Sequence, residues 1–161
     1  MNENRRGQTQ KSVGDNIKAT ACGSFVGRRG GAQMVNFTKW CYMKLGHVLH
    51  ELLHVLGFYH EQCRIDRDNF VAIISENIIQ GYFKNFQKCQ NTTDFGVGYD
   101  YYSVLHYDTF SLSKNGKPTI ITLNPNYKDK IGQRLSLSEK DVLKLKLMYN
   151  CEEAFPNVTS E

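Results

Sequence analysis

The pattern of apolar and polar residues changes its period along the chain, which predicts a fold that combines helices with short strands. Between residues 45 and 56 the apolar side chains cover most of the circumference of a helix, and Gly57 follows directly. This segment predicts a buried helix that ends at the glycine. A second helix is predicted near the C-terminal end, where Ser136 and Glu139 have the spacing of a capping box. The apolar residues that recur at helical spacing in it are Val142, Leu145, Met148 and Tyr149.

Short stretches rich in strand-forming residues surround the first helix. Three of them precede it, at 16–21, 24–26 and 33–36, and a turn rich in glycine and arginine separates the last two. They predict a small antiparallel sheet. After the helix we predict, in order, a β-rich segment at 69–74, a short amphipathic helix at 78–86 and a glycine-bearing loop at 94–100.

Length and composition limit the fold to one domain. The chain has 161 residues, of which 40% are hydrophobic, and this is enough for one core but not for two independent domains. Residues 1–14 are polar and contain glycine, so we expect a flexible lead or the remnant of a longer segment there. The net charge of +4 is spread along the chain, which gives no basis for nucleic-acid binding. No stretch is long and apolar enough for a membrane span.

The five cysteines are far apart in the sequence, and no two have the two-residue gap of zinc knuckles or redox motifs. We therefore expect disulfides and a secreted, extracellular protein. Three Asn-x-Ser/Thr sequons, at Asn36, Asn91 and Asn157, fit a secreted glycoprotein. The first residues contain no apolar signal core, so either the chain is part of a longer secreted precursor or the cysteines stay reduced.

The segment between His50 and His60 carries the candidate chemistry. His50 and His54 are four residues apart, so on a helix they project from the same face and can bind one metal ion. Gly57 allows the chain to reverse, which lets His60 reach the same ion as a third ligand. Three histidines with an open fourth position for water form the ligand set of a catalytic zinc. We therefore predict one Zn2+ per chain.

Glu51 follows the first of these histidines and is placed to take a proton from a water bound to the zinc. This predicts a hydrolase that cleaves peptide bonds with a zinc-activated water and Glu51 as the general base. Two other interpretations fit less well. Histidines that only satisfy core hydrogen bonds would bury polar groups to no purpose, and a closed structural zinc site would recruit cysteine and leave Glu51 without a role.

The residues that follow the third histidine are more specific. The sequence His60-Glu-Gln-Cys-Arg-Ile-Asp-Arg-Asp68 resembles the signature of the astacins, in which the third histidine is followed by Glu, then Arg, then Asp-Arg-Asp. Further matches run from about Ala21 to Cys151, and they include Cys22-Gly-Ser-Phe-Val-Gly-Arg28, Ser103-Val-Leu-His-Tyr107 and Ile131-Gly-Gln-Arg134. The resemblance implies an α+β, metzincin-like zincin with a small twisted sheet, a buried active-site helix and a C-terminal lobe with a closing helix. It places the catalytic domain at 15–151, incomplete on its N-terminal side, and a tail at 152–161.

The resemblance also implies roles for residues outside the histidine segment. Tyr107 would be an additional, switchable zinc ligand that can leave the metal and hydrogen-bond the oxyanion of the tetrahedral intermediate. Leu105 stands where the family has a methionine beneath the zinc, and we expect this packing change to be tolerated. The strand at 33–36 resembles the cleft edge where a substrate adds as an antiparallel strand. The implied partners are protein or peptide substrates, and we expect a monomer.

The pairing of the cysteines follows from the same resemblance. It implies a disulfide between Cys22 and Cys41, whereas Cys151 would pair with a cysteine in the missing front region and is left single here. Cys63 and Cys89 are additional to the family pattern, and a bond between them is a hypothesis. Because the front of the domain is missing, the alternative to a working peptidase is a zinc-binding but catalytically inactive fragment that binds peptides.

Overall fold

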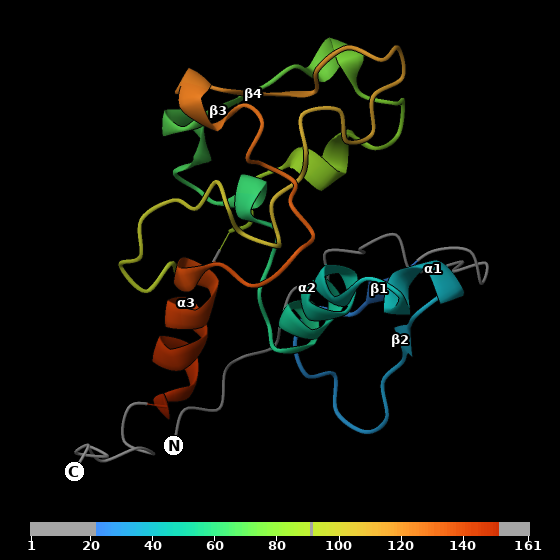
Figure 1. Cartoon of the computed structure of the whole chain (residues 1–161), viewed down its shortest axis with the longest axis vertical. Coiled ribbons are helices and arrows are strands. Elements are labelled where there is room, and N and C mark those ends of the chain that lie inside the picture. Colours follow the sequence, from blue (N-terminus) through green and yellow to red (C-terminus); the bar gives the residue numbers. More distant parts are fainter. Residues whose placement is uncertain (1–21, 91, 152–161) are drawn as a thin grey trace.

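A computed structural model describes residues 22–90 and 92–151 of the chain, and it mixes helices with small sheets (Figure 1). The helices are α1 (Lys39–Tyr42), α2 (Leu45–Val55) and α3 (Glu139–Tyr149). The strands are β1 (Gly23–Ser24), β2 (Val35–Asn36), β3 (Val71–Ile73) and β4 (Ile120–Thr122). Five short 3-10 turns lie between them, at Glu61–Cys63, Arg67–Asn69, Ser75–Asn77, Phe83–Phe86 and Pro125–Tyr127. The α+β class predicted from the sequence is confirmed.

The elements form two groups in space. Figure 1 shows α1, α2, β1 and β2 on one side of the molecule, and α3 with the β3–β4 pair on the other. The chain between α2 and β3 connects the two groups, and it carries the third candidate histidine.

In the ranges 22–90 and 92–151, no helix is long and apolar enough to cross a membrane.

Both sheets have two antiparallel strands. In the first, Ser24 pairs with Val35, and in the second, Ala72 pairs with Ile121. Strands were predicted at 24–26, 33–36 and 69–74, and the structure has a shorter strand at each place. The strand predicted at 16–21 lies outside the described residues.

The helix predicted at 78–86 is wrong. Ile78 instead forms an isolated antiparallel bridge with Ser113, and a 3-10 turn follows at Phe83–Phe86. Gly81 between them has a φ of +87°, a left-handed conformation that a continuous α-helix excludes. Ile78 and Phe86 are both buried in the core, so tertiary packing rather than helical amphipathicity explains their spacing.

Helix α2 ends where the sequence predicted, because Gly57 follows it with a φ of +105°. The predicted buried helix is buried on one face only. Leu45 and Leu52 are 65% and 43% exposed, whereas His50, His54 and Leu53 are buried. The face that packs against the rest of the molecule therefore carries both polar and apolar residues, and a count of apolar residues around the helix cannot reveal this.

The N-cap of helix α3 lies two residues later than predicted. Ser138 is the N-cap, its hydroxyl accepts from the backbone N–H of Asp141, and the Asp141 carboxylate accepts from the N–H of Ser138. The capping box predicted at Ser136 and Glu139 is therefore wrong, although both pairs have the same spacing. The carbonyl of Ser136 accepts instead from the side chain of Gln133 at 2.8 Å.

The core consists of two clusters. The smaller one lies under α2 and is built on three buried residues, Leu53, Val104 and Leu105. The larger one contains the buried residues Val71, Ile78, Phe86, Tyr99, Ile120 and Ile131. The segment from Val104 to Tyr107 contributes to both clusters and thereby passes beneath the candidate site.

Candidate metal centre and active site

Three imidazoles converge at the end of α2. His50 and His54 lie one turn apart on the helix, and His60 follows the chain reversal at Gly57. Their Nε2 atoms form a near-equilateral triangle, with separations of 3.1 Å between His50 and His54, 3.2 Å between His54 and His60, and 3.3 Å between His50 and His60. The three residues predicted as metal ligands are thus brought together as one group.

The other ring nitrogen of two of these histidines fixes the tautomer. His50 Nδ1 lies 2.7 Å from the carbonyl oxygen of Val104, and His54 Nδ1 lies 2.7 Å from that of Phe58. A carbonyl only accepts, so both Nδ1 atoms must carry the proton. The lone pair of each Nε2 is then directed into the triangle, which is the arrangement in which a second group orients a metal-binding histidine.

The triangle fits a tetrahedral metal ion. Zinc binds histidine nitrogen at roughly 2.0–2.1 Å, and tetrahedral angles then place the nitrogens about 3.3–3.4 Å apart, close to the observed separations. Burial lowers the pKa of His50 to about 2 and that of His54 to about 4, and it holds the pKa of His60 well below its usual value. All three rings are therefore neutral near pH 7, which is the form that binds a metal.

Glu51 lies on α2 beside the first histidine and is 7% exposed. The hydroxyl of Ser24 on β1 lies 2.9 Å from Glu51 Oε2 and 3.0 Å from the Glu51 backbone oxygen. Burial raises the pKa of Glu51, while the hydrogen bond from Ser24 and the nearby Arg134 guanidinium lower it. Ser24 could not be recognised as part of the site from the sequence, because a contact between residues 27 positions apart leaves no local pattern.

Tyr107 lies against the third histidine. Its ring centroid is 4.6 Å from that of His60, and its backbone N–H donates to Gln62 Oε1 at 3.1 Å. Burial raises the pKa of its phenol to about 12, so the hydroxyl stays protonated near neutral pH. The structure therefore brings together all five residues that the sequence singled out for the site.

Helix α3 supports the site from the other side of the molecule. The buried carboxylate of Asp141 accepts from Ser103 Oγ at 2.6 Å and from the backbone N–H of Val104 at 2.9 Å. The carbonyl of Val104 in turn accepts from His50. Leu105, which was expected to replace a methionine under the metal, is 2% exposed and packs in the cluster beneath α2.

The residue after the third histidine is also anchored. Glu61 is 3% exposed, and its carboxylate lies 2.8 Å from Lys144 Nζ on α3 and 3.2 Å from an Arg64 nitrogen. Its Oε1 also accepts from the backbone N–H of Asp100 at 2.9 Å. These contacts fix the turn that presents His60 to the other two histidines.

The cysteines agree with the predicted pairing in one case. Cys22 and Cys41 form a disulfide with their Cα atoms 6.1 Å apart, and this bond joins β1 to α1. Cys63 and Cys89 are neighbouring thiols in the structure, so the disulfide hypothesised between them is not formed there. The four other cysteines all lie within the described residues, and none of them is bonded to Cys151.

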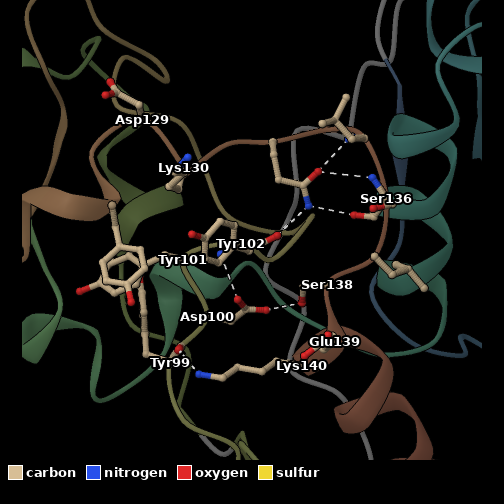
Figure 2. Close-up of a pocket in the computed structure, with 14 residues that line it drawn as sticks. Tyr99, Asp100, Tyr101, Tyr102, Asp129, Lys130, Ser136, Ser138, Glu139 and Lys140 are labelled. Atoms are coloured by element: carbon tan, nitrogen blue, oxygen red, sulfur yellow. Dashed lines mark hydrogen bonds between the residues drawn. The ribbon is translucent and has the colours of Figure 1, made fainter.

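A cavity of about 860 Å3 lies apart from the histidines, between the segment at 99–102 and the segment at 127–140 (Figure 2). Its walls carry tyrosines and charged side chains, and Tyr101 stacks on Tyr127 with ring centroids 4.2 Å apart. Asp100 hydrogen-bonds Ser138 across it, and Lys140 Nζ donates to the Tyr99 carbonyl at 2.8 Å. The cavity contains no histidine and no member of the candidate site.

The α+β fold presents three convergent imidazoles beside a carboxylate, which together form a candidate metal-binding site. Residues 4–150 match the family model described as Astacin, a peptidase family. The chain belongs to the astacin family, as the resemblance in the sequence implied.

Curated proteins and solved structures are similar to this chain. Zinc metalloproteinase nas-14 of Caenorhabditis elegans is 46% identical over 138 residues, which cover 84% of this chain and 27% of that protein. The astacin-like metalloendopeptidase of Mus musculus is 44% identical over 142 residues, which cover 88% and 32%. The structure of high choriolytic enzyme 1, a hatching enzyme zinc-protease from Oryzias latipes, matches with a TM-score of 0.77 and 40% identity, and the match covers 83% of this chain and 66% of that one. The chain thus spans about a quarter to a third of the length of these curated relatives.

Proposed function

We propose that this chain is a zinc-dependent metalloendopeptidase that hydrolyses peptide bonds in proteins or peptides. The observation that carries the proposal is the triangle of Nε2 atoms at 3.1–3.3 Å, with the buried Glu51 next to His50 on the same helix. One zinc per chain would be held by His50, His54 and His60. The relatives whose names describe zinc metalloproteinases support the same assignment.

Each residue of the site has a separate role in the proposed reaction. Zinc bound at the three Nε2 atoms would lower the pKa of a coordinated water towards roughly 7 and polarise the scissile carbonyl. Glu51 accepts a proton from the attacking water and passes it to the leaving amine. Ser24 holds the Glu51 carboxylate in place through its hydroxyl. Tyr107, protonated near pH 7, donates a hydrogen bond to the oxyanion that develops on the substrate carbonyl.

We also propose that the catalytic domain spans residues 15–151 and that the protein is secreted, monomeric and glycosylated at its sequons. The Cys22–Cys41 disulfide supports an oxidising compartment. Asn36 on β2 is the sequon asparagine that lies within the described residues.

The proposal is tested by replacing the general base without removing a ligand. Glu51→Gln should keep one zinc per chain and lose roughly 100-fold or more in kcat/KM on a quenched fluorescent peptide library. Glu76→Gln is the matched control, because it makes the same chemical change at an exposed residue outside the site. Equal hydrolysis by the Glu51→Gln and control proteins would remove Glu51 from the mechanism. Zinc binding without any cleavage by the unmodified chain would instead favour the alternative, a zinc-binding but catalytically inactive fragment.

A further inference from the structure

Cys63 and Cys89 form a buried pair of thiols directly behind the third histidine. Cys63 ends the 3-10 turn Glu61–Cys63, and Cys89 follows the turn at Phe83–Phe86. The two side chains are 2% and 8% exposed, and their thiols hydrogen-bond one another. The backbone N–H of Cys89 also donates to the carbonyl of Cys63 at 2.7 Å.

Two contacts hold the residues close to one another: the backbone N–H of Cys89 donates to the Cys63 carbonyl, and the two thiols are in hydrogen-bond contact. A disulfide requires such proximity, because it spans Cα separations of only roughly 4.4–6.8 Å. Arg67 already joins the two segments, since its guanidinium donates to the carbonyl of Gln62 at 2.8 Å and to that of Phe86 at 2.5 Å. The segments are therefore held together before any bond forms between the sulfurs.

We propose that Cys63 and Cys89 are a disulfide site, which an external disulfide such as oxidised glutathione closes. The Cys89 thiolate attacks one sulfur of the glutathione disulfide, and one glutathione thiolate leaves. The Cys63 thiol then loses its proton to solvent and attacks the Cys89 sulfur of the mixed disulfide, which releases the second glutathione. Two protein thiols are oxidised, and one glutathione disulfide is reduced to two thiols.

The order of attack follows from access. Both cysteines line a cavity of about 490 Å3, whose walls include Thr92 and Thr93, and Cys89 is the more exposed of the pair. The Cys63 thiol is 2% exposed and donates to the carbonyl of Asn85 at 3.4 Å. Cys89 is therefore the first nucleophile and Cys63 the resolving thiol.

The bond would stabilise the segment that presents the third histidine. The backbone N–H of Cys63 donates to the carbonyl of His60 at 3.0 Å, so fixing Cys63 fixes the turn that begins at His60. The bond would also join residues that are 26 positions apart (89 − 63) and restrict the unfolded chain. This inference concerns the cysteines alone, so it stands whether or not the zinc site is catalytic.

The direct test is to label thiols in the full chain after exposure to a glutathione buffer with excess oxidised form. The protein is denatured without reduction, alkylated, digested and analysed by mass spectrometry. We expect a linked peptide pair containing Cys63 and Cys89 and no alkylation at either residue. Alkylation of both residues in unreduced protein would overturn the proposal. The same measurement with a zinc chelator present shows whether bound zinc changes the labelling of the two cysteines.

A thermal measurement checks the consequence. Reducing agent should lower the Tm of the unmodified chain further than that of the Cys63→Ser/Cys89→Ser variant, by roughly 6 to 12 °C. Cys151→Ser is the matched control and should lose as much as the unmodified chain, because Cys151 lies outside the pair. An equal loss in all three proteins would contradict the proposal, and the labelling result holds even where the double variant fails to fold.

Discussion

Ser24 and Glu51 come from β1 and α2, and their contact orients the carboxylate next to the proposed metal ligands. Replacing Ser24 by alanine leaves the three histidines unchanged but removes the hydrogen bond to Oε2. We expect Ser24→Ala to retain one zinc per chain and to lose roughly 10-fold or more in kcat/KM, as is common for groups that orient a metal site from outside.

Ser24→Thr is the matched control for this variant, because threonine keeps the side-chain hydroxyl and is compatible with a strand. It should retain most of the activity. If the alanine and threonine variants hydrolysed peptides at the same rate, the hydrogen bond to Glu51 would have no part in catalysis.

Lys144 supplies the cation nearest to the buried carboxylate of Glu61, at 2.8 Å. Removing it leaves Glu61 with Arg64 alone at 3.2 Å, in a site that is 3% exposed. Breaking a buried pair in this way costs about 3–5 kcal/mol. We expect Lys144→Met to lower the free energy of unfolding by about this amount in urea denaturation.

Lys146→Met serves as the comparison, because Lys146 is exposed on the same helix. It should change the free energy of unfolding by less than about 0.5 kcal/mol. A cost for Lys144→Met as small as that of Lys146→Met would mean that the pair with Glu61 does not stabilise the fold.

Single residues differ in how far the sequence could reveal them. His50, His54, His60 and Glu51 were predicted because helical spacing and metal chemistry act over a few residues. Tyr107 came only from the resemblance to a family. Ser24, Asp141 and Lys144 were missed, because each acts on a partner at least 27 positions away, and such a contact requires the fold to be known.

At the scale of elements, α2 packs backbone against backbone at Gly46. A Cβ atom built on Gly46 would overlap the backbone carbonyl of Arg134. Inside an open helix, glycine to alanine would stabilise by about 1 kcal/mol. Here we expect the opposite sign, with Gly46→Ala lowering the free energy of unfolding by at least about 2 kcal/mol, because backbone atoms cannot move aside as a flexible side chain can.

Gly98→Ala is the control for the Gly46 variant, since the nearest atom to its added Cβ would be Lys140 Nζ at 3.6 Å, an ordinary contact. Thermal unfolding should separate the two variants clearly. A Gly46→Ala protein as stable as the unmodified chain would show that α2 does not approach residue 134 so closely.

Elements with a strong local signal were predicted best. The end of α2 was located by Gly57, and α3 was found from its apolar spacing, although its cap was placed at Ser136 instead of Ser138. The helix at 78–86 was wrong because its apolar residues face a core that other segments complete. The pairing of β3 with β4, almost 50 positions apart along the chain, leaves no trace in the local pattern.

At the scale of the whole molecule, the candidate metal centre lies where separate parts of the chain meet. Helix α2 contributes His50 and His54, the connection that follows contributes His60, and α3 supports the turn at 103–107 through Asp141. The α+β class and the family were accessible from the sequence, because the residues that follow the third histidine resemble a specific family signature. The packing of α3 against this motif was not, since it depends on contacts such as Lys144 with Glu61 that no spacing rule predicts.

The measurement that tests the central claim most directly is a titration of zinc into metal-free protein while peptide hydrolysis is followed. Activity should be absent without metal, rise in proportion to added zinc and level off at one equivalent per chain. His54→Ala should bind no zinc tightly and stay inactive, whereas His47→Ala, on the same helix but outside the triangle, should titrate like the unmodified chain. Hydrolysis that is independent of added zinc, or that survives in His54→Ala, would contradict the account.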